Sequence, residues 1–254
     1  MRIQPVWTRA IGGAAMTAVA ALYIVPRAGS DSNPINVAVS HLMPVTVTAV
    51  DTANDGWDLP NIDNPSVDSW ITRFTTSAGM RRTLSIWLDR KTKYDDMIST
   101  KLAERDMPQD LIYLAMIESG FNPKAKSPAA AGGLWQFISE TGRRYGLKVS
   151  GRVDERNQPD KATDAALSYL SDLYDRFGSW YLAAAAYNTG ENRVGRIMRE
   201  TTGSERGTDE DYYAIANRLP KETRDYVPKM IAAARIAKDP AQYGFDVPEV
   251  EIGD

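Results

Sequence analysis

The chain has 254 residues, of which 43% are hydrophobic and 25% are charged, and its formal net charge is −3. This is enough apolar material for one well-packed domain, and a net negative charge argues against a nucleic-acid partner. The sequence contains no cysteine and one histidine, His41. Disulfides, cysteine nucleophiles and thiolate metal sites are therefore excluded, and a histidine triad or a multi-histidine metal site is not expected. We expect no metal and no cofactor, so that any chemistry depends on carboxylates, amides, hydroxyls and phenols.

Residues 1–29 have the pattern of an export signal. Two arginines precede an apolar run from Ala10 to Val25, which is shorter than the roughly 18 apolar residues of a membrane-spanning helix. The segment is either a cleaved signal peptide or an uncleaved anchor in the inner membrane, and both interpretations place the protein in the periplasm. Residues 30–55 are polar, contain two prolines and lack a helical period. They predict a disordered linker.

Helical periodicity begins after this linker and predicts helices over residues 67–74, 80–90 and 94–105. Trp57, Trp70 and Trp87 in this part of the chain are candidate carbohydrate platforms, although aromatic residues at helical spacing more often belong to a core. We interpret residues 56–106 as an N-terminal helical extension packed on a catalytic domain of residues 107–248.

The next predicted helix ends in a carboxylate. Its residues Leu111, Leu114, Ala115 and Glu118 are spaced at i, i+3, i+4 and i+7. Residues at this spacing share one face of a helix. A carboxyl group that faces an apolar wall is costly to ionise, so we expect a raised pKa and a protonated general acid. The alternative is an ordinary solvated glutamate at a helix end, which is the commoner case for an isolated Glu.

A loop over residues 129–133 follows this helix and ends in two glycines. It leads directly to Trp135 and Gln136. Glycines beside an aromatic ring and an amide indicate a backbone that lies close to a ligand. Both side chains are therefore candidate sugar-facing groups.

The remainder of the chain also has helical periodicity. Further helices are predicted over residues 139–145, 161–177, 180–187, 191–200, 209–218 and 222–238. We expect a polar loop at 154–159, a turn at 188–190 and a flexible loop at 201–207. No strand run of any length and no repeat is present, so the predicted fold class is mainly α.

Four ordered motifs point to a known family. They are Glu118-Ser119, then Ser127 with GLWQF at 133–137, then AYNTGE at 186–191, and then ETRDYVPK at 222–229. In this order and spacing they resemble the motifs of the family 1 lytic transglycosylases, which share the SLT domain, and most of all the membrane-bound lytic murein transglycosylase D type. The resemblance covers about residues 54–248. One departure is Ala130, which stands where the family usually has glycine and is expected to stiffen the loop.

The resemblance implies a lysozyme-like, goose-type α fold that cleaves the β-1,4 bond between N-acetylmuramic acid and N-acetylglucosamine in the glycan strands of peptidoglycan. It implies a non-hydrolytic product with a 1,6-anhydro-muramic end. The residue that matches the family's catalytic acid, Glu118, would first protonate the leaving oxygen and then take a proton from the muramic C6 hydroxyl. The matching positions near the scissile bond are Ser127, Gln136, Tyr187 and Asn188. Tyr226 would hydrogen-bond Glu118 or the substrate.

A single acid is unusual, because glycosidases normally use two carboxylates about 5–5.5 Å or about 6.5–9.5 Å apart. The motifs contain no clear second acid. Glu191 is a candidate for one, but it starts a helix, where a capping role is the commoner one. Substrate assistance by the N-acetyl group fits one acid, with Gln136, Asn188 and Tyr226 as orienting groups. Buried hydrogen bonding is the alternative role for the two amides, and core packing is the alternative for Tyr187.

Two other functions stay open at this point. One is a muramidase, in which water attacks in place of the C6 hydroxyl. The other is a non-catalytic murein-binding scaffold of an envelope machine, whose partner the sequence does not identify.

Overall fold

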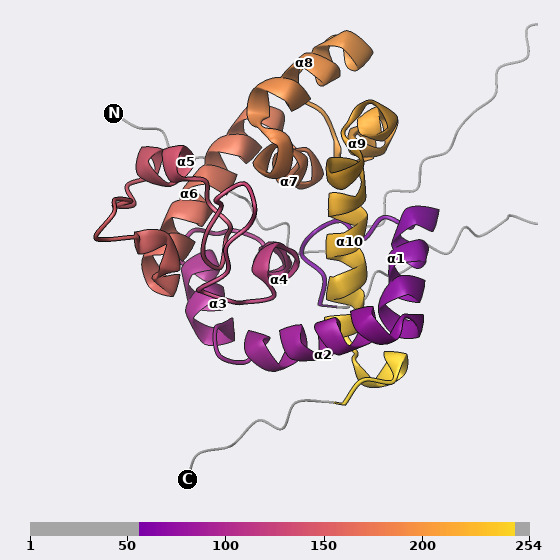
Figure 1. Ribbon diagram of the computed structural model, residues 1–254. Helices are drawn as coiled ribbons and strands as arrows, with labels where there is room; N and C mark the ends of the chain where they lie inside the picture. The colour runs from indigo at the N-terminus through magenta and orange to yellow at the C-terminus, as the bar shows by residue number, and fades with distance from the viewer. Residues whose placement is uncertain (1–55, 247–254) are drawn as a thin grey trace, which may run out of the picture. The chain divides into compact units, whose positions relative to one another are not determined.

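Helices make up nearly all of the regular structure in the computed structural model, which describes residues 56–246 (Figure 1). The described residues contain no strand, and their β-bridges are isolated. The predicted mainly α fold class is confirmed. None of the described helices is long and apolar enough to cross a membrane. The predicted export segment 1–29, the linker 30–55 and residues 247–248 of the predicted catalytic domain lie outside the described residues.

Ten α-helices and four short 3-10 turns follow one another in the described chain. The helices are α1 (Pro65–Thr76), α2 (Ala78–Lys91), α3 (Asp95–Ala103), α4 (Ile112–Ser119), α5 (Ser139–Arg144), α6 (Pro159–Phe177), α7 (Trp180–Thr189), α8 (Glu191–Thr202), α9 (Asp209–Ile215) and α10 (Lys221–Lys238). The 3-10 turns are η1 (Gln109–Leu111), η2 (Glu155–Asn157), η3 (Ala216–Arg218) and η4 (Ala241–Tyr243).

Every helix predicted from periodicity is present, but three loop predictions need correction. The predicted turn at 188–190 is wrong for its first two residues, which form the end of α7, and the predicted loop at 201–207 begins two residues too early. In both places a glycine, Gly190 or Gly203, ends the helix with a positive φ. The predicted polar loop at 154–159 contains a 3-10 turn, and its Glu155 and Arg156 are buried.

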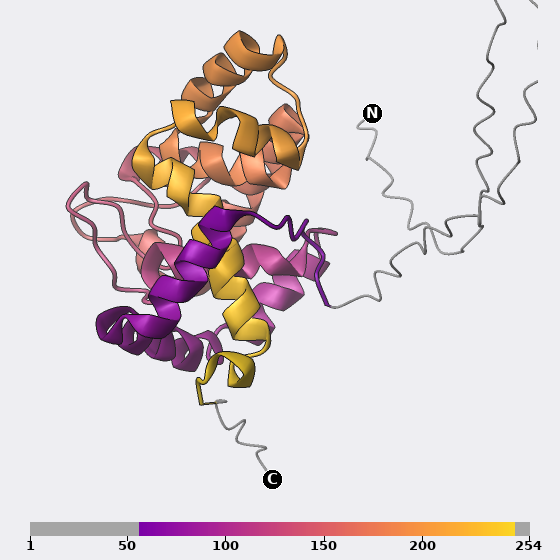
Figure 2. The same cartoon turned by 90° about the vertical axis from the view of Figure 1, so that its right-hand side faces the viewer.

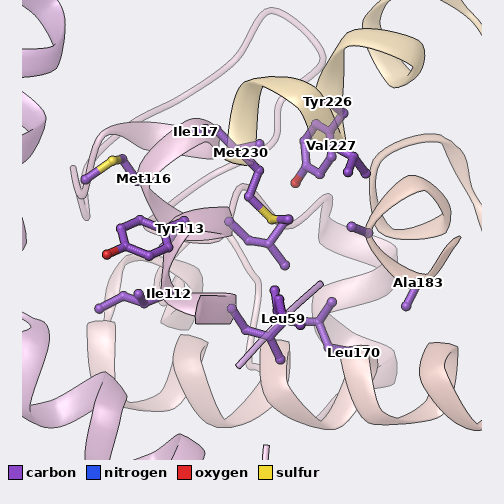
Figure 3. Packing of buried hydrophobic residues seen from close by; sticks show 14 of the residues in the cluster. Leu59, Ile112, Tyr113, Met116, Ile117, Leu170, Ala183, Tyr226, Val227 and Met230 are labelled. Carbon is purple, nitrogen blue, oxygen red and sulfur yellow. The ribbon is translucent and has the colours of Figure 1, made fainter. Parts of the chain in front are cut away.

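The long helix α10 packs against α1, α4 and α7, which come from three separate parts of the sequence. Figures 1 and 2 show α1 lying next to α10. Figure 3 shows Tyr226, Val227 and Met230 of α10 in one buried cluster with Ala183 of α7 and residues of α4. Residues 112–117 of α4 are all buried. A helix that is apolar on every side belongs in the interior of a domain, so α4 is held on all sides and its end is fixed in place.

The segment before α1 is tied to the start of the α4 region by two aspartates. The buried Asp110 carboxylate accepts hydrogen bonds from the backbone amides of Asp58 and Leu59, at 3.0 and 3.4 Å. In return, Asp58 accepts from the amides of Gln109 and Asp110, and Lys238 Nζ lies 2.6 Å from Asp110 Oδ1. The exchange satisfies amides that no helical carbonyl reaches. It therefore fixes both the lead-in and the C-terminal end of α10 next to η1.

Phe74 of α1 tests whether the N-terminal helices and the rest of the described chain unfold together. Its side chain is fully buried, so Phe74→Ala should lower the free energy of unfolding by about 3–5 kcal/mol. Ile86→Ala on α2, where the side chain is 40% exposed, is the matched control and should cost roughly 0.5 kcal/mol or less. Urea denaturation followed by circular dichroism measures both. We expect one transition in each variant, and an additional early transition in Phe74→Ala would contradict a shared unit.

Candidate active site

A cleft of about 820 Å³ lies at the C-terminal end of α4. Its walls come from the loop around residues 127–138, the end of α7, the start of α8 and one face of α10. All six residues singled out as site residues line this cleft: Glu118, Ser127, Gln136, Tyr187, Asn188 and Tyr226. The fold thus brings together side chains that are spread over more than a hundred positions of the sequence.

Glu118 occupies the last turn of α4, and Gly120 ends the helix with a φ of 57°. The Tyr226 hydroxyl donates a hydrogen bond to Glu118 Oε1 at 2.6 Å. Burial raises the pKa of Glu118 to about 7. The Tyr226 hydrogen bond and the charge of Lys229 act in the opposite direction, while the charge of Glu222 raises the pKa further. A carboxyl group with this pKa carries its proton near neutral pH and can act as a general acid.

Ser127 and Gln136 lie on the loop that faces Glu118. Ser127 Oγ accepts from the Ala131 amide at 3.1 Å. Gln136 Nε2 donates to the carbonyl oxygens of Gly133 and Ala125, at 2.8 and 3.3 Å. The amide nitrogen of Gln136 is therefore used to shape the loop. Its carbonyl oxygen is the polar atom of the side chain that remains for a ligand.

Tyr187 and Asn188 lie on the last turn of α7. The Tyr187 hydroxyl donates to the Trp135 carbonyl at 2.8 Å, and burial keeps its pKa well above the usual range. Asn188 Oδ1 accepts from Thr223 Oγ1 at 2.8 Å, and Asn188 Nδ2 donates to Glu222 Oε1 at 3.3 Å. These hydrogen bonds join α7 to the loop on one side and to α10 on the other, so the same side chains line the cleft and hold it together.

The expectation that the Trp135 side chain faces the cleft is wrong. Its ring is completely buried, and Nε1 donates to Thr163 Oγ1 of α6 at 2.9 Å. Trp57, Trp70 and Trp87 are partly buried and pack against the core. Trp70 also lines the cleft.

Arg156 is a supporting residue that sequence reasoning missed. Its Nη1 donates to the Ala130 carbonyl at 2.8 Å and to the Phe137 carbonyl at 2.9 Å, which fixes both arms of the loop. Nε and Nη2 of the same side chain donate to the Asp154 carboxylate, at 2.8 and 2.7 Å. Arg156 is only 7% exposed. No periodic pattern in the segment 154–159 marks a buried arginine, because its partners are backbone carbonyls distant in sequence.

Lys229 and Glu222 were missed for a different reason. They lie three residues after and four residues before Tyr226 on α10 and line the same cleft. The spacing i, i+4, i+7 places the three side chains on one helical face. The polar stripe has a helical period in the sequence, but periodicity alone does not distinguish a face that lines a cleft from an ordinary solvated face.

Three further carboxylates from the quoted motifs, those of Glu191, Glu222 and Asp225, also line the cleft. Glu191 bonds to Arg144 Nη1 at 2.9 Å and accepts from the Tyr169 hydroxyl at 3.0 Å. Partial burial raises the pKa of Glu191, but these hydrogen bonds outweigh it and the pKa is lowered. Glu191 thus has partners beyond the expected helix-capping role, and they favour its ionised form. Within residues 56–246, no group of three or more acidic or histidine side chains is placed to hold a metal ion.

The close approach of the loop to Arg156 can be tested at Gly133. Gly133 has a φ of +82°, and a Cβ there would lie 1.8 Å from the Arg156 carbonyl oxygen. Gly133→Ala should therefore reduce the free energy of unfolding by about 3 kcal/mol or more. Gly146→Ala is the matched control, because Gly146 has a φ of +88° but open space around it, and strain alone should cost roughly 1–2 kcal/mol. Equal losses in urea denaturation would contradict the steric argument.

The raised pKa of Glu118 predicts a stability difference that depends on pH. The pKa is 4.5 in the unfolded chain and about 7 in the folded protein, so the native state loses stability relative to the unfolded chain as the pH rises through this window. The glutamine side chain of Glu118→Gln cannot ionise, so the free energy of unfolding of this variant should exceed that of the wild type by about 1–2 kcal/mol near pH 8 and by almost nothing near pH 4. The figure for pH 8 is reduced from the full value of the pKa shift because the Glu118 side chain is partly exposed. Urea denaturation at the two pH values measures the difference. An equal difference at both would contradict the desolvation of Glu118.

Part of the chain is similar to known proteins. Residues 96–209 match the family model described as the transglycosylase SLT domain. The chain is 40% identical over 163 residues to membrane-bound lytic murein transglycosylase D of Escherichia coli K12, which covers 64% of this chain and 35% of that protein. It is 33% identical over 147 residues to the soluble lytic murein transglycosylase of Salmonella typhimurium, covering 55% of this chain and 22% of the relative. The chain thus spans about a third or less of the length of these relatives.

A solved structure agrees at the level of the fold. The crystal structure of the 70 kDa soluble lytic transglycosylase of Escherichia coli superposes with a TM-score of 0.50 and 23% identity, covering 73% of this chain and 34% of that chain. The lysozyme-like fold expected from the sequence is therefore present. Residues 96–209 thus match the transglycosylase SLT domain, and the chain is similar to lytic murein transglycosylases over part of its length.

Proposed function

We propose that this protein is a peptidoglycan lytic transglycosylase that cleaves the β-1,4 bond between N-acetylmuramic acid and N-acetylglucosamine without adding water. The observation that carries the proposal is the pair formed by Glu118 and Tyr226 in a large cleft, with the pKa of Glu118 raised to about 7. The printed functions of the relatives, which are lytic murein transglycosylases, support the substrate class.

In the proposed reaction, protonated Glu118 gives its proton to the glycosidic oxygen as the bond from that oxygen to C1 of the muramic acid breaks. The N-acetylglucosamine unit leaves with the new hydroxyl. The C6 hydroxyl oxygen of the same muramic acid then bonds to C1, and its proton passes to the Glu118 carboxylate. The product has a 1,6-anhydro end and Glu118 is again protonated, so the cycle needs no water and no second acid.

The neighbouring groups fit the supporting parts of this mechanism. The Tyr226 hydroxyl, at 2.6 Å from Glu118 Oε1, orients the carboxyl and stabilises it once it is ionised. Ser127, Gln136 and Asn188 present hydroxyl and amide groups to the cleft, where they would position the sugar and its N-acetyl group. Positioning of this kind is what converts an internal hydroxyl into an effective nucleophile.

A hydrolytic muramidase is the second candidate, and Glu222 is the observation that favours it. This exposed carboxylate lines the cleft, and its charge acts on Glu118. A second carboxylate can activate water in the manner of an inverting glycosidase. Against this, Asn188 Nδ2 donates a hydrogen bond to Glu222 Oε1 at 3.3 Å, so this oxygen already has a partner within the protein.

We further propose the organisation in which the reaction takes place. Residues 1–29 direct export to the periplasm, as a signal peptide or as an inner-membrane anchor, and residues 30–55 space the catalytic part from the membrane. Residues 56–106 form the helical extension on the catalytic domain 107–248. Peptidoglycan glycan strands are the partner, and a protein of the envelope machinery is a further partner that stays unidentified.

Glu118→Gln tests the proposed acid. An amide cannot donate the proton, so the release of muropeptides from purified sacculi should fall by roughly a thousandfold or more, while the far-ultraviolet circular dichroism spectrum stays that of the wild type. Mass spectrometry of the wild-type products should find 1,6-anhydro-muramic ends. Reducing ends would identify a muramidase, no release by the wild type would favour a murein-binding scaffold, and unchanged activity of Glu118→Gln would exclude Glu118 as the acid.

A further inference from the structure

A positive charge lies behind Glu118 in the wall of the cleft. Lys229 is three residues after Tyr226 on α10, and its Nζ donates to the Ile117 carbonyl at 3.3 Å. That carbonyl belongs to the residue before Glu118, in the last turn of α4. The ammonium makes no direct ion pair with Glu118 in the described part of the chain, so its effect on the carboxyl acts through space.

Two tryptophans from the N-terminal helices cover this charge. Lys229 Nζ lies 5.9 Å from the ring centre of Trp70 in α1 and 5.3 Å from that of Trp87 in α2. Trp87 also packs so closely on Gly120 that a Cβ there would lie 2.0 Å from its ring. Aromatic faces attract a cation and keep water away from it. Removal of water strengthens the interaction between Lys229 and a nearby carboxylate.

Among the charged groups around Glu118 and Lys229, Lys229 is the cation whose charge lowers the pKa of Glu118. On α10, the Tyr226 hydroxyl donates a hydrogen bond to Glu118, and the negative charge of Glu222 opposes the ionisation of Glu118. On α7, the charge of Glu118 raises the pKa of Tyr187. Burial lowers the pKa of Lys229 and Arg73 of α1 acts in the same direction, but the charges of Glu118 and Glu222 oppose both. The proposed reaction leaves Glu118 as a carboxylate in the middle of the cycle, at the negative end of a helix. A positive charge there would stabilise the carboxylate in addition to the hydrogen bond from Tyr226.

We propose that Lys229 is a positioning residue for the proposed transglycosylase reaction, a fixed and shielded positive charge that stabilises the Glu118 carboxylate between its two proton transfers. The role of Lys229 in the reaction rests on the proposed function. The effect of its charge on the pKa of Glu118 does not. It also gives α1 and α2 a part in the active centre, because these helices supply the two rings that shield the charge.

The test is a pH titration of Glu118 in three variants of the full chain, Lys229→Met, Lys229→Arg and Arg73→Met. Carbon-13 NMR of the Glu118 side-chain carboxyl measures the pKa in each. Lys229→Met should raise the pKa of Glu118 by about one unit, a tenfold change in its ionisation constant. Lys229→Arg keeps the charge and should give a value close to that of the wild type. Arg73→Met is the matched control, because Arg73 is an exposed cation over the Trp70 ring at 4.3 Å, and it should leave the Glu118 titration unchanged.

Activity provides a second, separable readout. The alkaline limb of the pH profile of muropeptide release should move upward in Lys229→Met and stay in place in Lys229→Arg. Loss of activity in both variants, with a Glu118 titration that does not change, would overturn the proposal and leave Lys229 as a cap of the α4 carbonyls. A wild-type protein that releases nothing from sacculi would remove the proposed function, but the NMR titration would still decide whether Lys229 sets the charge of Glu118.

Discussion

The hydrogen bond from Tyr226 to Glu118 joins two helices that are 108 residues apart in sequence. It requires that α10 packs on α4, that α4 ends where it does and that the phenol is buried. Burial of the carboxyl and donation by the phenol act in opposite directions on the proton: the first favours the neutral acid and the second favours the anion. Their balance, with a pKa of about 7, makes one carboxyl suited to give a proton and then to take one.

The loop opposite Glu118 is held in a conformation that its own sequence does not favour. Ala130 and Gln136 have φ values of 60° and 47°, in the left-handed region, where a non-glycine residue costs about 1–2 kcal/mol. Arg156 donates to the carbonyl oxygens of Ala130 and Phe137, and hydrogen bonds from a charged donor are among the stronger ones. The buried arginine therefore offsets the strain. Ala130 can keep its left-handed φ because the hydrogen bond from Arg156 holds its carbonyl in place.

The helices and the raised pKa of Glu118 could be predicted from the sequence because their signals are local. The apolar stripe that ends at Glu118 fixed both the helix and the expected direction of the pKa shift. The orientation of Trp135 could not be predicted, because it depends on Thr163, a partner from a helix 28 residues away. The role of Arg156 was hidden for the same reason, since its partners are backbone carbonyls of another loop. Periodicity reports which face of an element is buried, and it does not report which buried polar groups meet.

The electrostatic state of the cleft follows from where α4 ends. A helix C-terminus has a partial negative charge, which makes a carboxylate there less favourable, and Glu118 stands at this point beside the charge of Glu222. The helix ends at Ser119 because Gly120 has a left-handed φ of 57°, and a Cβ at this position would lie 2.0 Å from the Trp87 ring. The same tryptophan covers Lys229, whose ammonium bonds to a terminal carbonyl of α4. Trp87 thus packs against both the glycine that ends α4 and the lysine whose positive charge acts on Glu118.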